Sequence, residues 1–205
     1  SFSAPEEFLT ENIRMHSDLE PLGCLGDLGW YNIRFTLWVM NYLMPQSVTG
    51  RLLGATGRSD SPRPVPTEFA GEMLFDGDVS ASFYCSFLTE HQQWAHISGT
   101  KGSLRVDDFV LPYYGNSIDF MVSNPVFDCN VCDFHMERHE RQVIIDEYAN
   151  SHKTSQETKL FRKFSDLVLS GSSDSHWPEI ALQTQQVMMA CVESAENGGG
   201  EVSLG

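Results

Sequence analysis

The stretch that decides the fold is Leu22–Met44, which reads LGCLGDLGWYNIRFTLWVMNYLM. Glycines at positions 23, 26 and 29 give the backbone freedom and allow close approach, and the residues after Asp27 are apolar on nearly every side. The Asp27 carboxylate suits a helix N-terminus, and Pro45 cannot continue a helix. The stretch therefore predicts a buried helix that begins near Asp27 and ends around Pro45.

Asp27 and Tyr31 form the acid–base pair that the sequence favours. A helical spacing of four residues places the carboxylate and the phenol on the same face. They are the candidate catalytic residues of the chain. The alternative is that Tyr31 is a core aromatic residue whose hydroxyl finds a hydrogen-bond partner, and periodicity by itself favours that alternative.

The charge of the chain limits what it can bind. Thirteen Lys and Arg against 28 Asp and Glu leave a formal net charge of -15 over 205 residues. Nucleic acids and anionic lipid surfaces bind clusters of basic side chains, so this balance argues against both. It permits docking onto a basic protein surface. The apolar runs of Leu22–Met44 are too short for a transmembrane helix, because Asn32, Arg34 and Asn41 interrupt them.

The cysteines and the first residues bear on the compartment. Five cysteines, an odd number scattered along the chain, do not form the pattern of a disulfide scaffold. Residues 1–7 carry neither the basic nor the apolar region of a secretory signal. We therefore expect an intracellular, reducing compartment.

Hydrophobic periodicity predicts an α+β class with an open, mostly antiparallel sheet and helices that cover one face. A single domain over residues 1–205 is expected, with a helical segment at 1–46, the sheet at 47–149 and closing helices at 158–197. The expected helices are 5–10, 158–169 and 178–194, besides the one in Leu22–Met44. The expected strands are 48–56, 67–75, 79–88, 94–99, 102–112, 118–123, 142–148 and 201–204. No element is predicted over 124–140.

Four segments carry a resemblance to a known family: Glu20–Tyr31 (EPLGCLGDLGWY), Phe83–Phe87 (FYCSF), Ile97–Phe109 (ISGTKGSLRVDDF) and Trp177–Ala195. They resemble the C-terminal domain of the glucose-fructose oxidoreductase, inositol dehydrogenase and MocA-like family, above all its plant and algal members and the dihydrodiol dehydrogenases. The resemblance implies a second domain that normally follows a Rossmann domain holding NAD or NADP. In that family the sheet shapes the substrate site and builds oligomers. The resemblance also implies that Tyr31 is the proton donor and that Asp27 orients the site.

The chain lacks the cofactor motifs of that family. It contains no Gly-x-Gly-x-x-Gly between a strand and a helix, and the glycines at 23, 26 and 29 have the wrong spacing for a dinucleotide site. The Glu-Lys-Pro motif, whose lysine assists the proton donor in relatives, is absent too. No cofactor is therefore expected in this chain, and NAD(P) is expected only with an upstream Rossmann domain.

Two hypotheses follow from these observations. The leading one is a non-catalytic structural or interaction subunit that docks through its sheet onto proteins of a larger assembly, or onto further copies of itself. The plant and algal resemblance points to a plastid complex such as a photosystem, in the chloroplast stroma; the alternative location is the cytoplasm. The alternative is the substrate-binding domain of an NAD(P)-dependent oxidoreductase that acts on a sugar, polyol or diol.

Four potential zinc ligands lie within eleven residues: Cys129, Cys132, His135 and His139. Zinc fingers and ribbons separate their ligand pairs by roughly a dozen residues, so this stretch is too compact to wrap a metal. In an extended chain His135 and His139 share one face while Cys132 points to the other. The sequence therefore predicts buried thiols beside a polar strand, and no metal site.

Overall fold

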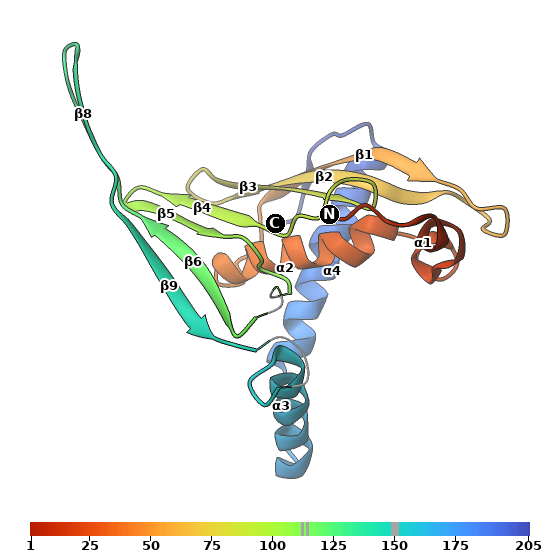
Figure 1. Cartoon of the computed structure of the whole chain (residues 1–205). Coiled ribbons are helices and arrows are strands. Elements are labelled where there is room, and N and C mark those ends of the chain that lie inside the picture. Colours follow the sequence, from red (N-terminus) through yellow and green to blue (C-terminus); the bar gives the residue numbers. More distant parts are fainter. Residues whose placement is uncertain (112, 114, 149–151) are drawn as a thin grey trace. The chain divides into compact units, whose positions relative to one another are not determined.

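The computed structural model describes residues 1–111, 113, 115–148 and 152–205, and it divides into two compact units. Unit 1 comprises Ser1–His91 and Asp174–Gly205, and unit 2 comprises Gln92–Ser173 (Figure 1). The α+β class with open, antiparallel sheets is confirmed. The described strands lie in two four-stranded sheets and a two-stranded ribbon, rather than in the one sheet that the sequence predicts. The predicted sheet boundary at residue 149 lies outside the described residues.

Unit 1 holds most of the helices. Its elements are α1 (Glu6–Glu11), the 3-10 helix η1 (Ile13–Met15), the π-helix η2 (Leu25–Gly29), α2 (Trp30–Val39), β1 (Ser47–Thr56), β2 (Val65–Phe75), β3 (Val79–Ser86), α4 (His176–Glu196) and β10 (Val202–Ser203). The strands pair in the order β10-β1-β2-β3, all antiparallel. Asp76, Gly77 and Asp78 make the predicted hairpin between β2 and β3, with Gly77 and Asp78 in the left-handed region at φ 73° and 59°.

The core of unit 1 lies between its sheet and its helices. Alternate residues of β2 and β3 are buried, as a half-buried sheet requires, and Phe69, Met73 and Cys85 are among them. Helix α4 packs directly on β1 (Figure 1). A Cβ at Gly50 would lie 2.1 Å from the carbonyl oxygen of Cys191, so only glycine permits this approach. The helices therefore cover one face of the sheet of unit 1, as predicted.

Helix α2 is shorter and more exposed than the sequence predicts. It ends at Val39, well before Pro45, because Asn41 and Tyr42 adopt left-handed conformations with φ of 53° and 60°. Only Ile33 and Leu37 are buried along it. The prediction of a fully buried helix is therefore wrong, because an apolar composition does not say which side has something to pack against. No helix among the described residues is long and apolar enough to cross a membrane.

The residues of unit 2 that the structure describes form a sheet, a ribbon and one helix. Its elements are β4 (Ala95–Gly99), β5 (Gly102–Val106), β6 (Ser117–Ser123), β7 (Val126–Asn130), β8 (Asp133–Glu137), β9 (Glu140–Asp146) and α3 (Gln156–Ser170). The sheet order is β4-β5-β6-β9, and β7 and β8 form the separate ribbon (Figure 1). The ribbon occupies the segment 124–140 for which no element is predicted. The strand predicted over 102–112 ends at Val106, and Pro112 lies outside the described residues.

Candidate active site

The site residue Asp27 lies in the π-helix η2, which runs directly into α2. The Trp30 N–H donates to the carbonyl of Leu25, five residues back, which defines the wider turn. Gly23 precedes this turn in a left-handed conformation with φ of 49°, and a Cβ there would lie 2.2 Å from the carbonyl oxygen of Pro66. The turn is therefore packed tightly against the first residues of β2. Helical residues lie on both sides of η2, and single-turn π-bulges within helices are frequent at functional sites.

Arg14 holds the carboxylate of Asp27. The distance between Arg14 Nε and Asp27 Oδ1 is 2.6 Å, and the side chains are 40% and 20% exposed. The backbone N–H of Arg14 donates to Asn12 Oδ1 at 3.0 Å, which caps η1 and positions the arginine. Arg14 is thus a site residue that sequence reasoning missed. The segment between residues 14 and 27 turns back and brings the two side chains together. No helical or strand period describes such a turn, so the spacing of the two residues in the sequence does not predict their contact.

Tyr31 lies on the first turn of α2 with 46% of its surface exposed. This exposure argues against the alternative in which Tyr31 is a core aromatic residue. Within the described part of the chain, no hydrogen bond joins its hydroxyl to Asp27 or to another side chain. The structure therefore places the two predicted residues at the same helix end without linking them directly. The phenol is open to a molecule from outside.

A loop of unit 1 braces the segment that carries Arg14. Arg58 donates from Nη1 to the carbonyl of Asn12 at 2.8 Å, and its Nη2 lies 2.6 Å from Asp60 Oδ2. The hydrogen bond from Arg58 holds the pKa of Asp60 below its ordinary value. Ser17, which is 4% exposed, accepts from the N–H of Arg63 at 3.2 Å. These bonds fix the loop 57–64 to residues 12–17, and so stabilise the arginine that faces Asp27.

The glycines of the site do not fit a dinucleotide cofactor. A pyrophosphate requires free N–H groups and no negative charge close to the glycine turn. A Cβ at Gly26 would lie 2.4 Å from Oε1 of Glu20, so a carboxylate occupies the space beside this glycine. The backbone of Pro66 fills the space beside Gly23. The described residues around this turn therefore do not form the phosphate cradle of an NAD(P) site.

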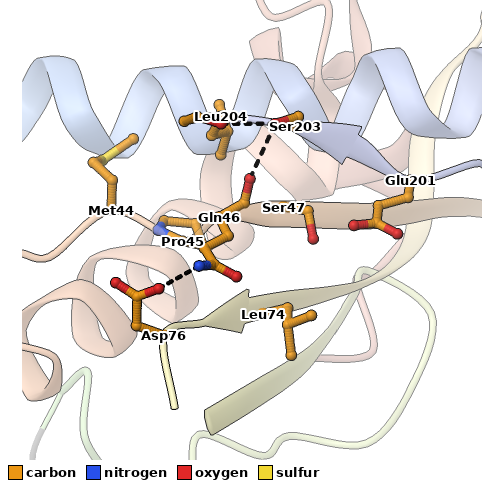
Figure 2. A pocket seen from close by; sticks show the side chains of 10 residues that line it. Met44, Pro45, Gln46, Ser47, Leu74, Asp76, Glu201, Ser203 and Leu204 are labelled. Carbon is orange, nitrogen blue, oxygen red and sulfur yellow. Dashed lines mark hydrogen bonds between the residues drawn. The ribbon is translucent and has the colours of Figure 1, made fainter. Parts of the chain in front are cut away.

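A groove of about 530 Å³ lies at the beginning of β1, away from the candidate pair. Its lining residues are Met44, Pro45, Gln46, Ser47, Leu74, Asp76, Glu201, Ser203, Leu204 and Gly205 (Figure 2). Gln46 organises it, since its side-chain amide donates to Asp76 Oδ1 and its backbone carbonyl accepts from the N–H of Leu204 at 2.8 Å. Neither Asp27 nor Tyr31 lines this groove, because it lies beyond the C-terminal end of α2 and they lie at the N-terminal end.

The Cys and His residues of the ribbon do not converge. His135 and His139 both contact Glu137, whose two oxygens lie 2.7 Å from the two Nε2 atoms. Cys129 pairs with Phe134 across the ribbon, so it lies on the other face from His135. Cys129 and Cys132 are exposed, and the prediction of buried thiols is wrong, because every residue of β7 and β8 is exposed. Those ranges contain no group of three or more His, Cys, Asp or Glu side chains placed to hold a metal ion.

The fold is an α+β domain, and the candidate pair Asp27 and Tyr31 lies where a π-turn enters a helix. The family model of the GFO/IDH/MocA C-terminal domain matches residues 2–105. The chain therefore belongs to this family.

Solved structures share the fold over nearly the whole chain. The aldose-aldose oxidoreductase from Caulobacter crescentus, complexed with glycerol, is 18% identical, with a TM-score of 0.67 over 95% of this chain and 51% of that one. Levoglucosan dehydrogenase, in complex with NADH and levoglucosan, is 18% identical, with a TM-score of 0.66 over 95% and 54%. A 3-ketoreductase from Actinomadura kijaniata, with NADP and TDP-benzene, is 19% identical, with a TM-score of 0.67 over 94% and 51%. The chain thus spans about half the length of these structures.

Proposed function

We propose that this chain is the substrate-binding domain of an NAD(P)-dependent oxidoreductase that acts on a sugar, polyol or diol. The observation that carries the proposal is the exposed phenol of Tyr31 at the same helix end as Asp27, which Arg14 holds at 2.6 Å. Reduction of a carbonyl and oxidation of an alcohol both use a side chain that gives or takes a proton within reach of the substrate, and an exposed phenol meets this requirement. The names of the three similar structures support this class of reaction.

Each residue of the site has a part in the proposal. Tyr31 gives a proton to the carbonyl oxygen in reduction, and takes it from the hydroxyl in oxidation. The ion pair of Arg14 and Asp27 orients the helix end. Because the two charges neutralise each other, no isolated charge remains near the reacting atoms. The cofactor whose nicotinamide would exchange the hydride would have to be held by residues other than this glycine turn, because the turn does not fit its pyrophosphate.

The enzymatic hypothesis is preferred to the non-catalytic subunit because the three similar structures are all named as oxidoreductases, dehydrogenases or reductases. The open face of the sheet of unit 1 is mixed rather than apolar; it carries Thr49, Arg51, Ala70, Glu72, Leu74, Ser80, Ser82 and Tyr84. A mixed face of this kind can contact water in a single copy and can also contact a second copy of an enzyme.

The experiment that tests the proposal starts from the polypeptide in its native source. Its intact mass is measured without proteolysis, and the same material is assayed for NADH- and NADPH-dependent reduction of aldoses and ketoses and for oxidation of diols. We expect a mass at least ~13 kDa above the 23.0 kDa of this chain, the size of a small nucleotide-binding domain, together with activity on one of these classes. A native mass equal to that of this chain would contradict the proposal, and binding partners would then be sought.

A further inference from the structure

Two buried cysteines lie in contact beneath the candidate site. Cys24 directly precedes η2, and Cys85 lies on β3; both have no exposed surface. Their Sγ atoms are 3.9 Å apart, and Cys24 Sγ also donates to the carbonyl oxygen of Cys85 at 3.6 Å. The two residues are 61 positions apart in sequence. The pair therefore joins the turn that carries Asp27 to the central sheet of unit 1.

We infer that Cys24 and Cys85 are the site of a reversible disulfide, which ties η2 to β3. The sulfur atoms have to approach by about 2 Å to reach the S–S bond length of roughly 2.05 Å. Cys191, the third buried cysteine, lies on α4 and has no sulfur partner within hydrogen-bonding distance among the described residues. The inference concerns the thiols alone and does not depend on the proposed catalytic activity.

The chemistry requires an external oxidant, for which a small-molecule disulfide such as oxidised glutathione suffices. The thiolate of one cysteine attacks the external disulfide, forms a mixed disulfide and releases one small thiol. The thiolate of the second cysteine then attacks the mixed disulfide, forms the Cys24–Cys85 bond and releases the second small thiol. The two cysteines are oxidised by two electrons, the external disulfide is reduced by two, and the two cysteine protons end on the released thiols. Excess small thiol reverses both steps.

Burial makes this reaction slow in the closed fold. The hydrogen bond with Cys85, and then burial, raise the pKa of Cys24 above its ordinary value, and burial raises the pKa of Cys191 to about 12. Because the thiolate is the nucleophile, the attack by Cys24 is slow at neutral pH and faster in alkaline solution. The small disulfide also needs a transient opening between η2 and β3 to reach the sulfur atoms. Disulfides that occur in reducing compartments are usually transient and act in catalysis or redox sensing, and reversibility is the property that this pair shares with them.

The test uses the full chain with Cys129→Ser and Cys132→Ser, which removes the exposed thiols. The protein is incubated at several pH values with oxidised and reduced glutathione, in buffer and in urea below the unfolding transition. It is then quenched with acid, alkylated in denaturant and mapped by mass spectrometry. We expect a peptide pair joined through Cys24 and Cys85, alkylated Cys191, loss of the link with excess dithiothreitol, and a Tm several degrees higher in the oxidised form.

The controls separate this pair from unspecific oxidation. Cys191→Ala should keep the Cys24–Cys85 link, and Cys85→Ala should lose it without forming a link between Cys24 and Cys191. Free thiols at both 24 and 85 in every condition would overturn the inference. So would a link from Cys24 to Cys191, or glutathione that stays on Cys24 with no second step.

Discussion

At the scale of single residues, the proposed function depends on the hydroxyl of Tyr31. Tyr31→Phe removes only that hydroxyl, and the side chain is 46% exposed, so the fold should be unaffected. In the native enzyme we expect kcat to fall by about 10²–10⁴, the usual contribution of a general acid, with Tm unchanged. Steady-state kinetics and thermal unfolding on the same preparations measure both quantities.

Tyr84 provides the matched control for that substitution. It is 43% exposed and lies on β3, where its hydroxyl donates to Glu68 Oε1 at 2.6 Å. Tyr84→Phe should leave kcat within about threefold, because an exposed hydrogen bond of this kind carries little free energy. If Tyr31→Phe retained as much activity as Tyr84→Phe, Tyr31 would have no part in proton transfer.

Gly23 is the residue at which the π-turn is most sensitive to substitution. Gly23→Ala forces a Cβ into a left-handed conformation and toward the carbonyl oxygen of Pro66, at 2.2 Å. We expect the free energy of unfolding to fall by about 3 kcal/mol, from both conformational strain and overpacking. Urea denaturation of the chain measures this loss.

Gly198→Ala separates the two contributions to that loss. Gly198 is also left-handed, with φ of 73°, but nothing lies within 4 Å of a Cβ built there. Its substitution should therefore cost only the conformational part, about 1 kcal/mol. If both variants lost the same free energy of unfolding, the overpacking against Pro66 would contribute nothing. The contact between Gly23 and Pro66 would then not hold the turn in place.

At the scale of elements, the β7–β8 ribbon differs from the two sheets. Its large apolar side chains are exposed. The rings of Phe127 and Phe134 stack with 6.0 Å between their centroids, but the two residues are 62% and 59% exposed. A two-stranded ribbon without a packed face is marginally stable in water. We therefore expect the backbone amides of Val126–Glu137 to exchange with deuterium much faster than those of β2.

Hydrogen–deuterium exchange with mass spectrometry measures that difference. Strand β2 is the internal control, because it is paired on both sides and carries buried residues such as Met73. Protection of the ribbon equal to that of β2 would mean that a surface covers it in solution. Slow exchange in the native assembly but not in the isolated chain would locate that surface on a partner.

The charge cluster at the C-terminal end of β8 predicts a pH dependence for the ribbon. Hydrogen bonds from His135 and His139 hold the pKa of Glu137 below its ordinary value. A depressed carboxyl pKa stabilises the fold above the unfolded pKa of glutamate, and that stabilisation is lost as pH falls through the folded pKa. In NMR titrations, His135→Gln with His139→Gln should return the pKa of Glu137 toward its ordinary value. An unchanged pKa would show that the imidazoles do not bind the carboxylate in solution.

At the scale of the whole molecule, charge and the open sheet face govern association. We propose that copies of the chain associate through the β1–β3 face opposite the helices, where Leu74 and Tyr84 are 41% and 43% exposed. The net charge of -15 opposes this association, so added salt should strengthen it by screening. Sedimentation velocity at low and high salt measures the effect.

Leu74→Lys tests the face itself. It removes an apolar contact from the face and leaves the buried side of β2 unchanged, so association should weaken at every salt concentration. Leu182→Lys is the control, since Leu182 is 59% exposed on α4, away from this face. A monomeric wild-type chain at all concentrations, or equal effects of the two variants, would contradict the proposed face.

Much of the architecture could be predicted from the sequence because it follows from local periodicity. The alternating residues of β2 and β3, the Asp76–Asp78 hairpin and the cap Gly171 after α3 all lie where the pattern places them. The ribbon within 124–140 was not predicted, because its apolar side chains are exposed and so show no contrast between a buried and a solvent face. The division of the strands between two sheets depends on pairing between distant segments, which periodicity does not encode.

By itself, the sequence determined the α+β class, the acidic surface and the spacing of Asp27 and Tyr31 on one helix end, since these depend on composition and on neighbours within a few residues. Only the tertiary structure decided the rest of the site. It decided that Arg14 meets Asp27, that Tyr31 is exposed, and that Cys24 lies against Cys85. Arg14 and Asp27 are 13 positions apart, and Cys24 and Cys85 are 61 positions apart. Both contacts arise because tertiary packing around the turn brings these segments together.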